Sequence, residues 1–212
     1  MDEYYHIYNR GVMKRAIFID DRDYSRFLFL ILFLQSSAHN FDHITRSISH
    51  FGKHRMFDIE AEMVKEISRS REVNLLAFTL QPNHFHLIVR ELTEGGMAKY
   101  LQRIGNSHTK YFNIKYKQSG HLFQNSYQSV HIEDNEQLLY TSAYIHKHAP
   151  KINYEWSSYQ DYIKENRWGD LLGTSLVLEQ FKNPEEYHQW LKDCPAKETA
   201  EFGKHPMLDN SA

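Results

Sequence analysis

Apolar and polar side chains alternate along this chain with two periods. A period of two among aromatic and β-branched side chains predicts strands, at residues 4–9, 75–80, 84–90 and 127–132. Apolar side chains that recur every three or four positions predict amphipathic helices, at residues 20–37, 59–68, 97–116 and 135–148, the last ending before Pro150. Residues 81–83 contain Pro and Asn, which favour a turn, so residues 75–90 should form a hairpin.

This order of elements predicts the fold. Strand, helix, two-stranded hairpin, helix and strand are typical of a ferredoxin-like (RRM-like) α+β fold, an antiparallel sheet with helices packed on one face. The open face could hold a site. Residues 40–56 are polar and histidine-rich without clear periodicity, so we expect a loop there, and residues 156–163 and 184–191 predict short helices. We therefore expect a main domain over residues 1–163 with an insertion around 39–70, a C-terminal helical extension over 164–194 and a disordered tail over 195–212.

Composition narrows the class of protein. The 212 residues are 41% hydrophobic and 25% charged, which suits a soluble globular protein. The single cysteine, Cys194, excludes an intrachain disulfide and a cysteine-based zinc cluster. The first residues lack the apolar stretch of a secretory signal, and the longest apolar run, residues 27–34, is too short to cross a bilayer. We expect a cytoplasmic protein with no membrane partner.

The distribution of charge says more than the net charge of −2. Residues 95–132 contain no Asp or Glu, and their cations are interleaved with aromatic side chains. Such a segment can follow phosphates and stack unpaired bases, but it could equally be a solvated basic helix whose aromatic side chains face the core. On the first interpretation, the candidate DNA contacts in this segment are Arg103, Lys110, Lys115, Lys117 and Tyr127.

Two short motifs carry candidate chemistry. His84 and His86 are two residues apart on a predicted strand, so both side chains point to one face and could share a metal ion. A solvent-facing histidine pair has the same pattern. Tyr144 and His148 lie one turn apart on a predicted helix, which would offer a nucleophile and a third ligand together. Tyr144 could also be a packing tyrosine, and His148 a cap at the end of the helix.

Five blocks in order, taken with these motifs, resemble the REP-associated tyrosine transposases of the single-tyrosine HUH transposase family. They are Tyr-His-Ile-Tyr-Asn-Arg-Gly at 5–11, Pro-Asn-His-Phe-His at 82–86, Gly-His-Leu-Phe-Gln at 120–124, Tyr-Ile-His at 144–146 and Trp-Ser-Ser-Tyr at 156–159. The resemblance covers roughly residues 4–163. It implies a magnesium or manganese site at the two histidines, and cleavage and rejoining of single-stranded DNA near a hairpin such as a REP-like palindrome, through a 5′-phosphotyrosine at Tyr144.

The resemblance also extends the list of candidate residues. Further DNA contacts would be Asn9, Arg10, Gln124 and Lys147. Relatives complete the metal site with an amide oxygen where this chain has His148. A third imidazole would move the preference from magnesium towards manganese, cobalt or zinc. We expect a monomer or a homodimer. The alternative function is a non-catalytic module of the same fold that binds hairpin DNA or RNA.

Overall fold

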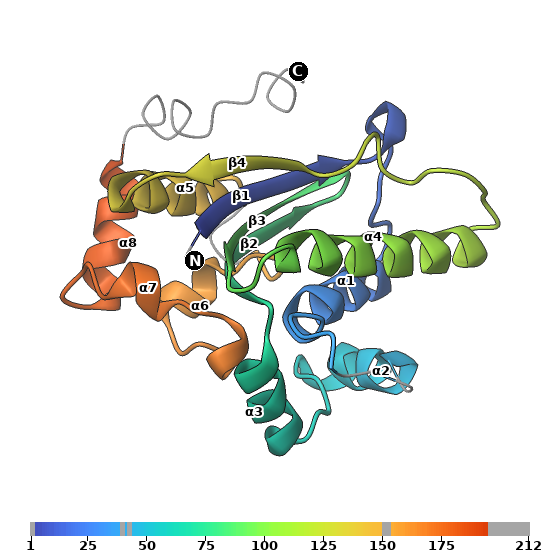
Figure 1. Cartoon of the computed structure of the whole chain (residues 1–212), viewed down its shortest axis with the longest axis horizontal. Coiled ribbons are helices and arrows are strands. Elements are labelled where there is room, and N and C mark those ends of the chain that lie inside the picture. The colour runs from blue at the N-terminus through green and yellow to red at the C-terminus, as the bar shows by residue number, and fades with distance from the viewer. Residues whose placement is uncertain (1–2, 39–40, 42–43, 150–153, 195–212) are drawn as a thin grey trace.

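The protein is described by a computed structural model that covers residues 3–38, 41, 44–149 and 154–194. Its centre is a four-stranded antiparallel sheet in the order β2-β3-β1-β4 (Figure 1). The strands are β1 (Glu3–Arg10), β2 (Val73–Gln81), β3 (His84–Glu91) and β4 (Gln128–Ile132). Each agrees with a predicted strand to within about two residues. The α+β fold and the antiparallel sheet expected from the sequence are confirmed.

One face of the sheet packs against α1 (Asp21–Phe33) and α4 (Gly96–Lys115). Along β3, Phe85, Leu87 and Val89 belong to this core while Ile88 belongs to the opposite one, as the alternation of a strand requires. The helix α1 begins at a capping box, in which the side chains of Asp20 and Asp23 accept each other's backbone N–H groups. The apolar stretch that follows is buried almost throughout.

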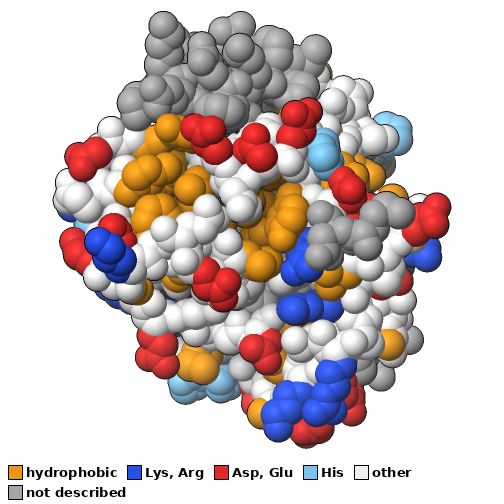
Figure 2. All heavy atoms as spheres, turned by 60° about the vertical axis from the view of Figure 1, so that its left-hand side comes forward, with side chains coloured by type: hydrophobic (Ala, Val, Ile, Leu, Met, Phe, Trp, Pro, Cys, Tyr) orange, Lys and Arg blue, Asp and Glu red, His pale blue; other side chains and the backbone are white. Residues whose placement is uncertain are grey.

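The other face of the sheet carries α5 (Asn135–Lys147) and the C-terminal elements α6 (Tyr159–Ile163), α7 (Ser175–Leu178) and α8 (Pro184–Asp193). His146 joins them, because its ring nitrogens bond the Tyr187 hydroxyl at 2.6 Å and the Ser158 hydroxyl at 2.9 Å. Seen from this side, the surface shows apolar patches among scattered acidic side chains (Figure 2). This is the face that the sequence predicted to be open, and α5 presents its side chains to it.

Residues 44–54 differ from their prediction. The loop expected there is wrong, because Ile44–His54 forms the helix α2, which packs against α1. Ile44, Ile48 and Phe51 recur at helical spacing and face the core, but they stand so far apart among Ser and His that the period is easy to miss. The helix α3 follows at Ala61–Ser70, and short 3-10 turns lie at Val12–Lys14 and Gly169–Leu171.

Some expectations fall outside the described residues. These are the tail over 195–212 and the helix stop at Pro150. The helix expected over residues 20–37 ends at Phe33. Among the helices that the structure describes, none is long and apolar enough to cross a membrane.

Candidate metal centre and nucleophile

Three imidazoles meet where the start of β3 passes the end of α5. His84 and His86 point to the same face of β3, and His148 directly follows α5. Each offers one ring nitrogen, and these three atoms lie within 4.8 Å of one another. The ring centroids are separated by 5.2 Å for His84 and His86, 5.5 Å for His84 and His148, and 5.0 Å for His86 and His148. One ion of a transition metal could contact all three nitrogens.

Hydrogen bonds fix which nitrogen of His84 and His86 faces the cluster. His84 Nδ1 lies 2.7 Å from Asn83 Oδ1, and the amide of Asn83 is oriented by its own bond to the Lys14 carbonyl. His86 Nδ1 lies 2.9 Å from His6 Nε2. The Nε2 atoms of His84 and His86 are buried with no hydrogen-bond partner among the described residues. Metal-binding histidines have this arrangement, in which the second nitrogen is held by a neighbour, so the site fits a metal ion.

The surroundings keep these imidazoles neutral. Burial lowers the pKa of His84, and together with the nearby His148 and Arg10 it brings that pKa to about 3. Burial also lowers the pKa of His86 well below its usual value, together with His6, His148, His84 and Arg10. Because a ligand histidine must be deprotonated, both side chains are ready to bind a metal at neutral pH.

Tyr144 lies beside the cluster, one turn before His148 on α5. Its ring centroid is 5.0 Å from that of His148 and 5.5 Å from that of His86, and the residue is 8% exposed. The end of the helix is held by Gln81, whose side chain donates to the His148 carbonyl. Tyr140, one turn earlier, packs instead against Trp190 of α8. The helix thus offers Tyr144 to the histidines and directs Tyr140 elsewhere.

Part of the chain that holds this site is similar to a known protein family. Residues 48–148 match the profile of the family described as "Transposase IS200 like". This segment resembles IS200-like transposases. The matched segment includes Tyr144 and all three histidines of the cluster. No curated protein matches the chain.

The end of β1 lies outside the segment that resembles IS200-like transposases, yet it brings further groups to the site. Arg10 stands opposite His84 in the pairing of β1 with β3, and its side chain is 5% exposed. Asn9 accepts a hydrogen bond from the Arg10 backbone and donates one to the Asn125 carbonyl. Of the two, Arg10 lies next to the histidines, and Asn9 points to the other face of the sheet.

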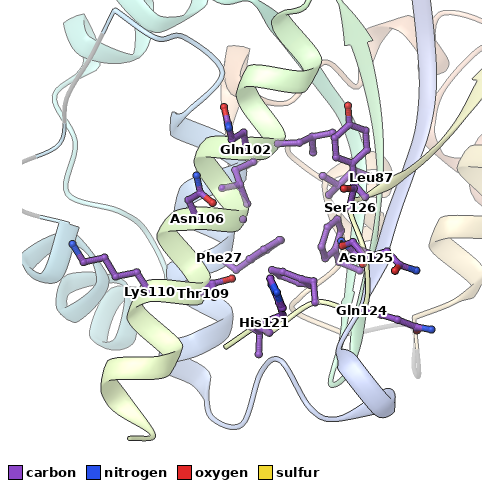
Figure 3. Close-up of a pocket in the computed structure, with 18 residues that line it drawn as sticks. Phe27, Leu87, Gln102, Asn106, Thr109, Lys110, His121, Gln124, Asn125 and Ser126 are labelled. Carbon is purple, nitrogen blue, oxygen red and sulfur yellow. The ribbon is translucent and has the colours of Figure 1, made fainter. Parts of the chain in front are cut away.

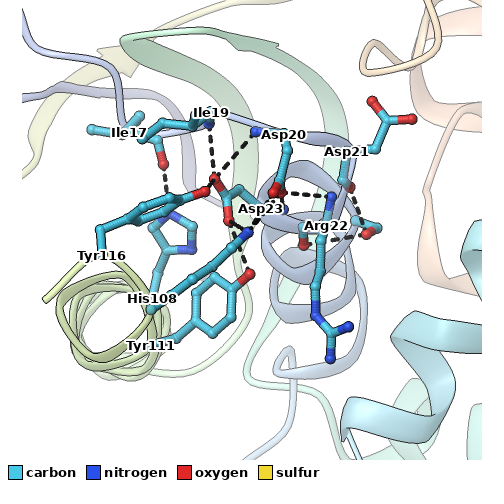
Figure 4. Close-up of polar contacts among 11 residues, drawn as sticks. Ile17, Ile19, Asp20, Asp21, Arg22, Asp23, His108, Tyr111 and Tyr116 are labelled. Atoms are coloured by element: carbon cyan, nitrogen blue, oxygen red, sulfur yellow. Dashed lines mark hydrogen bonds and ion pairs between the residues drawn. The ribbon is translucent and has the colours of Figure 1, made fainter.

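Three of the predicted DNA contacts are already engaged within the protein. Lys115 lies 2.7 Å from carboxylate oxygens of both Asp20 and Asp23, and Asp23 is fully buried (Figure 4). Arg103 pairs with Glu72 at 2.9 Å and also donates to the Leu34 carbonyl. The ammonium of Lys147 donates to the Cys194 carbonyl. These cations join elements of the fold, so they are poor candidates for binding phosphates.

The remaining candidates lie on α4 and in the segment between α4 and β4. Lys110 and Lys117 are exposed on α4 and directly after it, and Gln124 is exposed in the segment before β4. Tyr127 is half-buried at the end of that segment. His108, on the apolar face of α4, is fully buried and bonds the Ile17 carbonyl at 2.9 Å. It is a packing residue.

On the first strand, His6 could face either the core or the site from its sequence alone, and Asn83 was not among the candidate site residues. Both orient the metal-facing histidines. Asn83 has a local signal, since it directly precedes His84. The alternation of β1 indicates which face His6 shares with its neighbours. Its contact with His86 can be predicted only if the pairing of β1 with β3 is also known.

Proposed function

We propose that this protein is a transposase-like endonuclease that cuts and rejoins single-stranded DNA next to hairpins, with Tyr144 as its nucleophile and a divalent metal ion as its cofactor. The observation that carries the proposal is the convergence of Tyr144 with His84, His86 and His148. The match to IS200-like transposases supports DNA as the substrate.

The proposed reaction transfers the scissile phosphoryl group from a DNA 3′ oxygen to Tyr144. The Tyr144 phenol oxygen attacks the scissile phosphorus, and the bond from phosphorus to the 3′ oxygen breaks. The products are a 5′-phosphotyrosine and a strand with a free 3′ hydroxyl. Attack by the 3′ hydroxyl of a second strand on the phosphotyrosine reforms a phosphodiester and releases Tyr144. Because the bond between phosphorus and Tyr144 replaces the bond that was cut, its energy is conserved in the intermediate and rejoining needs no nucleotide cofactor.

A phenol with a pKa near 10 is a poor nucleophile at neutral pH without assistance. A divalent cation held by His84, His86 and His148 would polarise the phosphate and neutralise charge as the new bond forms. Magnesium or manganese would serve, and the all-imidazole ligand set favours manganese. Arg10, which pairs with His84 across the two strands, would bind a non-bridging oxygen of the same phosphate.

The DNA-contact surface that we propose is narrower than the one expected from sequence. It keeps Asn9, Arg10 and Lys110 together with Lys117, Gln124 and Tyr127. It keeps Asn9 and Arg10 because the end of β1 adjoins the histidines. It omits Lys115, Arg103 and Lys147, whose cationic groups join distant elements of the fold.

Covalent capture tests the proposal. With manganese and a labelled single-stranded oligonucleotide that carries a hairpin, the wild-type protein should form an adduct that survives denaturing electrophoresis. Tyr144→Phe should abolish the adduct, whereas Tyr140→Phe, one turn away on the same helix, should retain it. An adduct on a residue other than Tyr144 would contradict the assignment of the nucleophile. Tight hairpin binding without any adduct would instead favour the non-catalytic binding module.

A further inference from the structure

A cleft of about 680 Å³ opens on the face of the sheet opposite the histidines. One wall is α4, and the other is the segment of residues 121–127 that leads into β4 (Figure 3). Phe27 and Leu87 lie between the two walls. Its volume is within the range typical of ligand-binding pockets, about 300–1,000 Å³.

The lining of the cleft is apolar at its base and rich in amides at its walls. Phe85 and Leu87 form part of the base with Phe27, and all three are buried. The amides of Gln102 and Asn106 lie on one wall and that of Asn125 on the other. None of the described residues that line the cleft is acidic. This chemistry suits a flat aromatic ligand that has hydrogen-bonding edges and is attached to an anionic chain.

The cleft and the histidine cluster are joined through the end of β1. Asn9 lines the cleft, and the next residue, Arg10, stands beside His84 on the other face. The segment that forms the second wall is fixed to this point, because Gln124 N donates to the Arg10 carbonyl at 2.8 Å and Phe123 forms a bridge with Gly11. A single strand of DNA that passes round this end of the sheet would contact both the cleft and the histidine cluster.

We propose that the cleft binds an unpaired nucleobase of the DNA strand whose phosphodiester lies at the histidine cluster. The inference rests on the proposed function for the identity of that strand. Amide side chains match the donor and acceptor pattern of base edges, and aromatic side chains such as Phe123 and Tyr127 stack on bases. Lys110, exposed at the wall of the cleft, meets the phosphate beside the base.

Gly105 gives a direct test, because it lines the cleft from α4 and a Cβ added there meets nothing within 4 Å. Gly105→Leu therefore adds a bulky apolar side chain at the wall of the cleft from an unobstructed Cβ position, and replacing a helical glycine favours the helix. Gly52→Leu is the matched control. Gly52 is also a helical glycine with open space around its Cβ, but it lies on α2, away from the cleft.

Binding is measured without divalent cations, against a labelled oligodeoxythymidine and an abasic strand of the same length. Wild type and Gly52→Leu should bind oligodeoxythymidine about tenfold more tightly than the abasic strand, the lower part of the contribution of one stacked base. Gly105→Leu should bind both strands equally, at the abasic level. Retention of the preference by Gly105→Leu would overturn the inference. So would an equal loss of affinity for both strands, because the cleft would then hold the sugar-phosphate chain.

This outcome is separate from that of the covalent capture experiment, since the binding assay needs neither Tyr144 nor the metal. A normal adduct in wild type together with an unchanged base preference in Gly105→Leu would overturn the cleft alone. Absence of the adduct together with a lost preference in Gly105→Leu would support base binding in the cleft and contradict the proposed nuclease activity.

Discussion

His6 Nε2 lies 2.9 Å from His86 Nδ1, and this contact links β1 to the metal-facing strand β3. For the buried Nε2 of His86 to offer its lone pair to a metal, its Nδ1 must carry the proton and donate to His6. His6 therefore sets the tautomer of His86. A neighbour of this kind typically contributes ten- to hundredfold to metal affinity.

We expect His6→Phe to weaken manganese binding by about ten- to hundredfold, because the ring keeps the packing and removes the acceptor. His6→Gln should recover part of the affinity through its amide oxygen. Titration of manganese followed by electron paramagnetic resonance measures both, and circular dichroism checks the fold. Equal affinity in wild type and His6→Phe would show that His6 does not orient the ligand.

His148→Asn should change which metal supports the reaction. An imidazole binds first-row transition metals more tightly than an amide oxygen does, whereas magnesium prefers oxygen ligands. We therefore expect manganese to outperform magnesium in wild type, and the advantage to shrink in His148→Asn with cleavage retained. The ratio of adduct yields at equal concentrations of the two metals measures this. His54→Asn, at the exposed end of α2, should leave the ratio unchanged. If His148→Ala bound manganese as well as wild type, His148 would only cap the helix.

The arrangement of the histidine cluster was predictable because each half of it is local. His84 and His86 share a face through the period of a strand, and Tyr144 and His148 share one through the turn of a helix. Nothing local predicts that the two halves meet. That step came from the resemblance to transposases, and the structure places the halves together.

The predictions of phosphate contacts depended on what lies far away in sequence. Lys110 and Lys115 look alike on α4, yet only Lys115 reaches the carboxylates of Asp20 and Asp23 on the neighbouring helix. Periodicity gives the face of a helix, but not the residue that it will meet across the core. The cleft was equally hidden, since its two walls come together only in the folded chain.

Lys115→Met and Lys110→Met should therefore fail in different ways. Burial by itself would raise the pKa of Asp23, but hydrogen bonds from Lys115, Tyr116 and the Ile19 backbone lower it, so the carboxylate is charged in the core. Removing Lys115 leaves that charge poorly compensated, which should cost about 3 kcal/mol of unfolding free energy. Urea denaturation measures the loss.

The same two variants separate structure from DNA binding. Lys110→Met should change the unfolding free energy by less than about 0.5 kcal/mol, because Lys110 is exposed. It should reduce the slope of DNA affinity against salt concentration by about 0.7, the value for one phosphate contact on single strands. A normal salt slope in Lys110→Met would move the binding surface away from α4.

His108 should make stability fall with acidity. Burial lowers its pKa from 6.5 to about 4, even though the hydrogen bond to the Ile17 carbonyl acts in the opposite direction. Between pH 6.5 and 4 the unfolded chain binds a proton at this position and the folded chain does not. The unfolding free energy should therefore decrease as the pH falls through this window, by about 1.4 kcal/mol per pH unit from this group.

His108→Gln can keep a hydrogen bond to Ile17 but cannot titrate. The difference in unfolding free energy between wild type and His108→Gln should then shrink steadily from pH 6.5 towards 4. A constant difference would mean that His108 titrates alike in the folded and unfolded chains.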